Sequence, residues 1–394
     1  MKMLRTVLGS IAACALSCGA WAQQPPIKIG VLMPTSGVLA ALATEQINGM
    51  NIALEESGGA VAGRKVEMIV EDYEAKPNVG LTKARKLILS DKVDVLTGIV
   101  GSDVALAVRP FAESNRVPVV IANAGANALT GENCSPWMFR VSFSHAQMVS
   151  NFGAWLVKRG IRRVYALGAD FVSPREMVEA FRKGFVAAGG TIVGEAFSPY
   201  ATTKDFGPYL AQARSANPDA ILAVYYGAEA ILFVKQYQSF GMKDKHKLVS
   251  TMGLTPQMLR KAQGDAAADI LGSLNYVPEL DTAANKAFQT VYQKKYGALG
   301  AEFAVMGYDA MRFILEALKS VNGRTDDKAA IAAAIRKVSY DGPRGPMSID
   351  SRNNALTQNI YMTETVNQGG QVVFRVLDTV PRVADPAEGC KMAR

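Results

Sequence analysis

Histidine is almost absent from this 394-residue chain, and the motifs that usually mark a reactive site are missing as well. The two histidines, His145 and His246, have no neighbours at the spacing of a metal site. There is no Walker A loop, no His-Glu-x-x-His, no Gly-x-Ser-x-Gly, and no glycine-rich dinucleotide loop after the first predicted strand. We therefore expect no metal, no cofactor and no catalysed reaction.

The composition excludes several other classes of protein. Basic residues number 43 against 35 acidic ones, for a net charge of +8, and no run of Lys or Arg indicates a nucleic-acid surface. With 49% hydrophobic and 20% charged residues, the chain resembles an ordinary globular protein rather than a disordered one. Its length suggests roughly two or three domains, each large enough to bury a core.

Long apolar runs are scarce, and the clearest one lies at the N-terminus. Two basic residues precede the apolar stretch 7–20, which ends in Ala20-Trp21-Ala22. We therefore expect a secretory signal peptide over residues 1–22 and a periplasmic protein. The stretch is shorter than the ~20 residues that span a bilayer. The alternative is a lipoprotein signal that would leave a lipidated Cys14.

Cysteine is also rare. Two of the four cysteines fall in the predicted leader, so the mature chain retains Cys134 and Cys390. An even pair in an exported protein predicts a disulfide, and two free buried thiols are the alternative. Closing so long a loop could stabilise the fold by about 5 kcal/mol, as an upper bound.

From Ile27 onward, short β-branched runs alternate with amphipathic stretches of helical length. This pattern predicts an α/β protein with two doubly wound lobes. The predicted strands are 27–33, 66–73, 93–100, 117–123, 163–167, 191–197, 220–226 and 247–252. The predicted helices are 42–56, 77–90, 103–115, 147–158, 174–188, 206–216, 229–240, 282–296, 303–320 and 327–337. Residues 359–380 are predicted to form two strands around Asn367-Gln368-Gly369-Gly370.

Ligands of open α/β sheets bind at the carboxyl ends of the strands, so the loops there are candidate binding sites. Ser102 and Asp103 open a helix, where a hydroxyl and free backbone N–H groups could face an anion; either residue could instead serve only as an N-cap. The next predicted strand is followed by four small residues, Ala124, Gly125, Ala126 and Asn127. They allow a ligand to approach the backbone closely, although Gly125 could equally serve only a turn.

The second half offers aromatic residues at equivalent positions. Phe171 follows one strand and leads into a helix in which Pro174 is expected at the first position. Tyr225 and Tyr226 end another strand, one turn before Glu229. Two aromatics beside a glycine suit a platform for a ligand ring, and the alternative is that they belong to the core.

These loops, in this order, resemble the branched-chain amino-acid type of periplasmic solute-binding protein, the receptor subunit of ABC importers. The resemblance spans the mature chain, from Lys28-Ile29-Gly30-Val31-Leu32 through 342–346 to 385–390. Residues 123–130, with Cys134-Ser135-Pro136 and Phe139-Arg140, are similar to a subgroup that includes receptors for aromatic carboxylates.

The family's fold implies two lobes joined by three crossovers, expected near 142–146, 273–277 and 347–351. The expected divisions are a first lobe of 23–143 plus 276–348, a second lobe of 144–275 plus 349–380, and a tail of 381–394 tied by Cys390.

The resemblance also implies how a ligand is held. A serine matching Ser102 and the loop matching 124–127 would bind its carboxylate, and Ser36, in the turn after the first strand, is a further expected contact. Amino-acid binders pair the ammonium with an acid after the strand at 247–250, where this chain has Met252. A buried ammonium without a counter-charge is costly, so Met252 argues against an α-amino acid, although Glu229 could substitute for the missing acid.

We therefore expect the extracytoplasmic substrate-binding subunit of an ABC importer. It would capture a small, aromatic carboxylate in an interlobe cleft that closes on binding, and present it to a permease in the inner membrane. We expect a monomer with no nucleic-acid partner. The alternatives are a branched-chain or neutral amino-acid binding protein and, of another class, a sensory receptor subunit.

Overall fold

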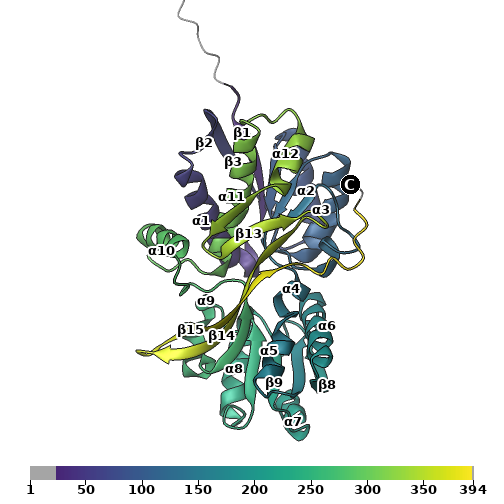
Figure 1. The fold of residues 1–394 in the computed structure, drawn as a ribbon, viewed down its shortest axis with the longest axis vertical. Helices are drawn as coiled ribbons and strands as arrows, with labels where there is room; N and C mark the ends of the chain where they lie inside the picture. Colours follow the sequence, from purple (N-terminus) through teal and green to yellow (C-terminus); the bar gives the residue numbers. More distant parts are fainter. Residues whose placement is uncertain (1–23, 393–394) are drawn as a thin grey trace, which may run out of the picture.

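The computed structural model describes residues 24–392, and Figure 1 shows them as two lobes stacked along the long axis of the molecule. The predicted signal peptide and the alternative lipidation site at Cys14 lie outside the described residues. None of the helices in this range is both long and apolar enough to cross a membrane.

The first lobe contains the N-terminal elements and a later helical segment (Figure 1). Its elements are β1 (Ile27–Met33), η1 (Gly37–Leu39), α1 (Ala40–Glu56), β2 (Ala60–Val61), β3 (Arg64–Asp72), α2 (Pro77–Arg85), η2 (Lys86–Ser90), β4 (Val95–Gly98), α3 (Ser102–Ser114), β5 (Val119–Ile121), η3 (Asn127–Leu129), β6 (Met138–Arg140), α10 (Ala283–Tyr296), α11 (Glu302–Ser320), α12 (Lys328–Arg336), β12 (Ser339–Gly342) and β13 (Gly345–Asp350).

The second lobe repeats the alternation of strand and helix and receives the last two strands. Its elements are α4 (His145–Val149), α5 (Phe152–Lys158), β7 (Arg163–Ala169), α6 (Val172–Ala187), β8 (Thr191–Ser198), α7 (Gly207–Ser215), β9 (Ala220–Val224), α8 (Gly227–Ser239), β10 (Lys247–Thr251), α9 (Gln257–Gln263), η4 (Gly264–Ala267), β11 (Ile270–Leu274), β14 (Ala355–Gln368) and β15 (Gln371–Val383).

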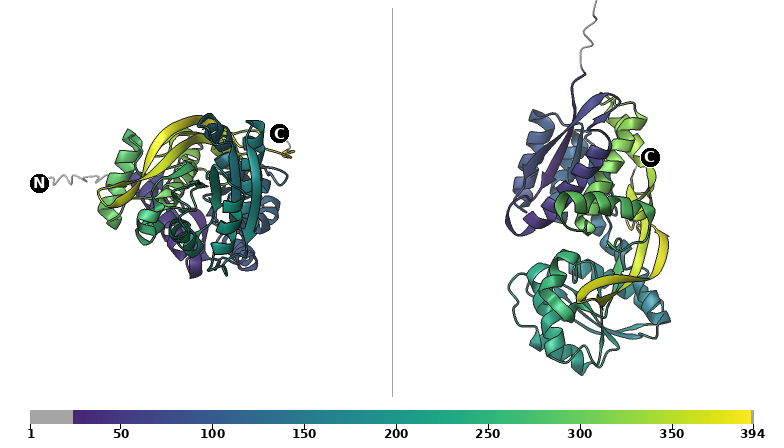
Figure 2. Two further views of the ribbon diagram at one scale, coloured as in Figure 1. Left: turned by 90° about the horizontal axis from the view of Figure 1, so that it is seen from below. Right: turned by 90° about the vertical axis from the view of Figure 1, so that its left-hand side faces the viewer.

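One strand links the sheets of the two lobes. The order is β2-β3-β1-β4-β5-β6-β14-β11-β10-β9-β7-β8, and the strands from β3 to β6 and from β11 to β8 pair in parallel with their neighbours in each half. Ala355 at the start of β14 pairs with Arg140 of β6, while 361–364 pair antiparallel with β11. The long β14–β15 ribbon therefore runs from the first lobe along the second (Figure 2). The predicted doubly wound α/β class is confirmed.

The central parallel strands form because their side chains are mostly apolar on both faces, whereas the outer strands β3 and β8 are partly exposed. In β1, six of the seven residues are buried, and helices cover both sides. The helices α1 and α11 pack closely against each other. A Cβ atom at Gly49 would lie 1.9 Å from the carbonyl oxygen of Ala304, so only glycine fits at this contact.

Three stretches connect the lobes. Two lie between β6 and α4 and between β11 and α10, and the third is β14 itself, which pairs with β13 and β6 at its start and with β11 farther along. The first two overlap the crossovers expected near 142–146 and 273–277. The third lies later than the expected 347–351, because β13 and the start of β14 form a hairpin in the first lobe. The exact residue boundaries of the lobes stay a prediction.

Several local expectations need correction. The helix expected at 147–158 is divided into α4 and α5, and α6 begins at Val172, so Pro174 is its third residue rather than its first.

Two other local predictions are confirmed. The hairpin around 367–370 is present, with positive φ at Gly369 and Gly370. The predicted disulfide is also present: Cys134 and Cys390 are bonded, with their Cα atoms 5.5 Å apart.

Candidate functional site

Ser102 lies at the turn between β4 and α3 in the first lobe. It is the first residue of α3, with Gly101 as the N-cap, so the alternative of a serine N-cap is wrong. The hydroxyl of the buried Tyr73 accepts the N–H groups of Val100 and Gly101, both at 3.0 Å, and thereby fixes the turn. Burial raises the pKa of Tyr73 to about 12, so this hydroxyl stays neutral.

The loop 124–127 lies directly beside Ser102. The N–H of Ala126 donates to Oγ of Ser102 at 3.0 Å, which leaves the serine proton to donate to another acceptor. Ala124, Gly125 and Ala126 are buried, whereas Asn127 is partly exposed. The first-lobe residues expected to hold a carboxylate are thus in contact with one another.

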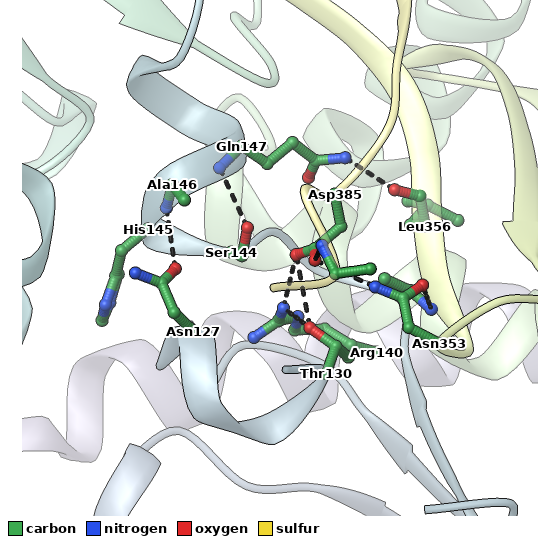
Figure 3. A network of polar contacts seen from close by, with 12 residues as sticks. Asn127, Thr130, Arg140, Ser144, His145, Ala146, Gln147, Asn353, Leu356 and Asp385 are labelled. Carbon is green, nitrogen blue, oxygen red and sulfur yellow. Dashed lines mark hydrogen bonds and ion pairs between the residues drawn. The ribbon is translucent and has the colours of Figure 1, made fainter. Parts of the chain in front are cut away.

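A buried cation supports this loop from behind. Arg140 at the end of β6 donates to the carbonyl oxygen of Ala126 at 2.6 Å and pairs with Asp385 of the C-terminal tail at 2.7 Å. Figure 3 shows this pair together with Thr130 and Asn353, which also bind Asp385. Because the guanidinium is fully buried, it depends on Asp385 for its charge compensation. The disulfide ties the same tail to the first lobe.

The aromatic residues of the second lobe form a separate group. The rings of Phe171 and Tyr226 lie 5.7 Å apart, and Tyr200 packs on Phe171 at 4.4 Å. The hydroxyl of Tyr226 lies 2.8 Å from Oγ of Ser173 and 3.6 Å from the sulfur of Met177. The partly buried Tyr226 and Phe171 thus lie at the carboxyl ends of β9 and β7, as expected.

Tyr225 lies apart from this group. Its side chain is fully buried and packs on Phe206 and Phe233, with ring centroids 5.0 and 4.6 Å away. Ile221, Ala223 and Tyr225 belong to one core layer, while the alternate residues of the strand face the other layer. The two tyrosines therefore do not form one platform, and Tyr225 follows the alternative core interpretation.

The other residues predicted to contact the ligand lie in different surroundings. Met252 is buried in the core layer that also receives Tyr226. The Glu229 carboxyl faces the backbone of Ala201 and Thr203, and burial raises its pKa above the ordinary value. Asp103 is exposed and accepts the Val104 N–H; Ser36 is also exposed, beside Asp72.

The helix α6 brings the two groups together across the lobe boundary. Its Glu176 accepts the backbone N–H of Asn127 in the first lobe at 3.0 Å, and the next residue, Met177, contacts Tyr226 in the second lobe. Ser102 and Tyr226 are therefore connected through a short chain of contacts, on loops that face the same boundary.

A buried polar network crosses the same boundary behind these loops. Arg344 donates to the carbonyl of Val141 at 2.9 Å and to Oε1 of Gln358 at 2.8 Å. Gln147 donates to the carbonyl of Leu356 at 2.6 Å, as Figure 3 shows. The β6–α4 connection and β14 are thus joined by hydrogen bonds at the place where a hinge is expected.

Two residues of this region were missed as site residues. His145 donates its backbone N–H to Gly125 at 2.8 Å, and its Nδ1 lies 2.6 Å from Oε2 of Glu176. The sequence offered one signal, because His145 is one of only two histidines and opens a predicted second-lobe segment. Nothing in the sequence indicated Glu176, because its partners lie 31 and 49 residues away.

A groove of about 770 Å³ lies elsewhere, between the segment 279–282 and the β14–β15 ribbon. It contains none of the predicted site residues, and we assign the site instead to the facing loops, which combine hydroxyl, backbone and aromatic groups. Within residues 24–392, no cluster of three or more His, Cys, Asp or Glu could hold a metal ion.

Comparisons with known proteins agree with this architecture. A model of the periplasmic binding protein family matches residues 26–371. The chain belongs to this family. It is 27% identical to the Leu/Ile/Val-binding protein homolog 6 of Brucella melitensis over 390 residues, which cover 98% of this chain and 99% of that protein.

Two solved structures are similar over most of both chains. The solute-binding protein of an ABC transporter from Rhodopseudomonas palustris, in complex with 3,4-dihydroxybenzoic acid, is 32% identical with a TM-score of 0.86, covering 92% of this chain and 99% of that one. A leucine-binding protein from Thermotoga maritima is 27% identical with a TM-score of 0.79, covering 90% and 99%. This periplasmic binding protein is the substrate-binding component of an ABC transporter and not an enzyme. Such proteins bind small molecules and deliver them to a membrane permease.

Proposed function

We propose that this binding protein captures a small aromatic carboxylate for import. Ser102 and the loop 124–127 bind the carboxylate, with the hydroxyl of Ser102 as donor. Phe171, Tyr226 and Met252 provide ring, sulfur and apolar contacts to the body of the ligand. The ligand stabilises a closed arrangement of the lobes because it contacts both of them there.

The position of Glu229 is the observation that carries this proposal. Its carboxyl lies near the backbone of Ala201 and Thr203, and burial, which disfavours the charged form, raises its pKa. Met252 occupies the position where amino-acid binders of this family are expected to have an acid. A ligand ammonium would therefore meet an apolar side chain at Met252 and a carboxyl at Glu229 whose charged form is disfavoured, whereas a carboxylate meets the hydroxyl of Ser102.

A branched-chain or neutral amino acid is the second candidate ligand class. It is favoured by the similarity to the Brucella and Thermotoga proteins, whose names refer to leucine, isoleucine and valine. Asp103 is the exposed acid nearest in sequence to Ser102, although its Oδ1 already accepts the Val104 N–H at 2.9 Å. A sensory receptor subunit would use the same lobes and differ only in its membrane partner.

A ligand panel tests the proposal. Benzoate, 4-hydroxybenzoate, cinnamate, leucine and valine are added to the purified protein, and its melting temperature is measured. Because a ligand that binds only the folded state raises the melting temperature, the aryl acids should raise it and the amino acids should not. A rise with leucine or valine and none with the aryl acids would replace this proposal by the amino-acid one.

A matched pair of variants tests the role of Ser102. Ser102→Ala should weaken binding of the best aryl acid by about 1.5–3 kcal/mol, the contribution of a hydrogen bond to a charged group. The control is Ser114→Ala. Ser114 lies at the other end of the same helix, its hydroxyl donates to the carbonyl of Phe111, and its replacement should leave the affinity unchanged. Titration calorimetry gives both affinities, and equal values in the two variants would contradict the assignment.

We also propose the accompanying features of the family for this chain: export by the signal peptide 1–22 to the periplasm, the lobe divisions expected from the sequence, and a monomeric state in solution. N-terminal sequencing of the exported protein distinguishes cleavage before Gln23 from lipidation at Cys14.

A further inference from the structure

We propose that Glu176 is a positioning residue that fastens the carboxylate loop 124–127 of the first lobe to the second lobe, and so increases ligand affinity by stabilising the closed arrangement. This inference rests on the proposed function and adds a residue that does not itself contact the ligand.

One of the two contacts of Glu176 crosses the lobe boundary. One oxygen, Oε2, accepts the N–H of Asn127 at 3.0 Å and lies 2.6 Å from Nδ1 of His145. The side chain is only 25% exposed, so water competes weakly for these bonds. The bond to Asn127 joins the two lobes, and the bond to His145, which lies with Glu176 in the second lobe, holds the carboxylate in position for it.

The protonation states favour this link. Burial lowers the pKa of His145, so the ring is neutral and its Nδ1–H donates to the carboxylate. Burial opposes ionisation of Glu176, but the bonds from His145 and Asn127 outweigh it and hold its pKa below the ordinary value. A charged acceptor thus faces two neutral donors.

The loop is shaped to receive this link. The ring of His145 lies against Gly125, where an added Cβ would come within 2.8 Å of the ring atoms. The carbonyl of Gly125 accepts the His145 N–H, and Oδ1 of Asn127 accepts the Ala146 N–H at 2.8 Å (Figure 3). Glu176 completes this set from a different helix, so the loop bearing the ligand donors follows the position of the second lobe.

The helix that carries Glu176 also contacts the aromatic group of the second lobe. Met177, the next residue on α6, contacts the hydroxyl of Tyr226. One helix therefore touches the loop expected to bind the ligand carboxylate and the aromatic residue expected to bind its ring. Loss of the Glu176 contact should release the closed form and speed ligand dissociation.

Three variants test the proposal, with benzoate as the probe. Glu176→Ala should weaken benzoate binding roughly tenfold or more, mainly through faster dissociation, because it removes a charged acceptor. Glu176→Gln keeps an acceptor for Asn127 and should lose less. Glu179→Gln, on the same helix and paired only with Arg182 in the described contacts, is the control and should match the wild type. Calorimetry gives affinity, and stopped-flow fluorescence gives the two rate constants.

Two affinity results would overturn the proposal. Unchanged affinity in Glu176→Ala would show that the contact does not contribute to closure, and tighter binding would show that the Glu176 carboxylate competes with the ligand. If the wild-type protein binds no aryl acid, the proposed function fails. The link is then still tested by X-ray scattering of the free protein: Glu176→Ala should increase the radius of gyration and Glu179→Gln should not, and an unchanged radius in Glu176→Ala would refute the link.

Discussion

Replacement of Asp385 by asparagine is expected to destabilise the whole protein, although the residue lies only nine positions from the C-terminus. The change keeps the size of the side chain nearly constant and removes its negative charge. Arg140 would then remain buried, with about 1% of its side chain exposed, and without an anionic partner in the described network. Breaking a buried ion pair on one side costs about 3–5 kcal/mol, because the remaining charge is not compensated.

The magnitude can be expressed as a melting temperature. Unfolding entropy is roughly 2.1 cal/mol/K per residue, so about 370 residues give roughly 0.8 kcal/mol/K, and the loss corresponds to about 4–6 °C. Differential scanning calorimetry measures this shift. Glu388→Gln is the control on the same tail, since its side chain is 74% exposed and its contact with Lys183 is long, at 3.4 Å. A shift below about 1 °C in Asp385→Asn would refute the claim that Arg140 depends on this partner.

Three further predictions concern stability. Gly49→Ala should cost at least about 1–3 kcal/mol in urea titrations, because the added methyl meets the carbonyl of Ala304, and an unchanged midpoint would contradict this. Burial raises the pKa of Glu45 from 4.5 to about 8; since the folded state then holds a proton that the unfolded chain releases, stability should fall as the pH rises from about 4.5 to 8. Glu45→Gln should remove this loss of unfolding free energy, which amounts to about 1.4 kcal/mol for each unit by which the pKa is raised. If the stabilities of the two proteins depended on pH in the same way, Glu45 would not be the group responsible. Replacing Cys134 and Cys390 by serine should lower the stability by at most about 5–6 kcal/mol, measured by thermal melts beside reduced wild-type protein, whereas equal melting temperatures of variant and oxidised wild type would show that the bond constrains little.

The sequence predicted the regular elements well because their patterns are local. The apolar runs of β1 and β9 and the amphipathic α11 carry their period within a few residues, so burial of one face follows directly. Elements without such a pattern were missed. The strand β2 has two residues, and β12 and β13 form a short hairpin whose residues are partly exposed.

The geometry of β9 separates Tyr225 from Tyr226. Side chains alternate between the two faces of a strand, and this alternation continues for two residues beyond the end of β9 at Val224. Adjacent tyrosines at a strand end therefore point to opposite layers, and at most one of them can face the lobe boundary. Tyr226, which follows Leu222 and Val224 in this alternation, is the one that does.

The contacts across the lobe boundary were not predictable in the same way. The hydrophobic periodicity of the sequence predicts the helices and strands within each lobe. The pairing of Glu176 with Asn127 depends instead on how one lobe is placed on the other. Neither residue stands out alone, since a glutamate on a helix is ordinarily solvated and an asparagine in a loop ordinarily caps a turn. Their pairing follows only once the β14 strand fixes the two sheets relative to one another. The residues proposed to touch the ligand were therefore predicted from strand ends, whereas the residue proposed to control closure was found only at the boundary between the lobes.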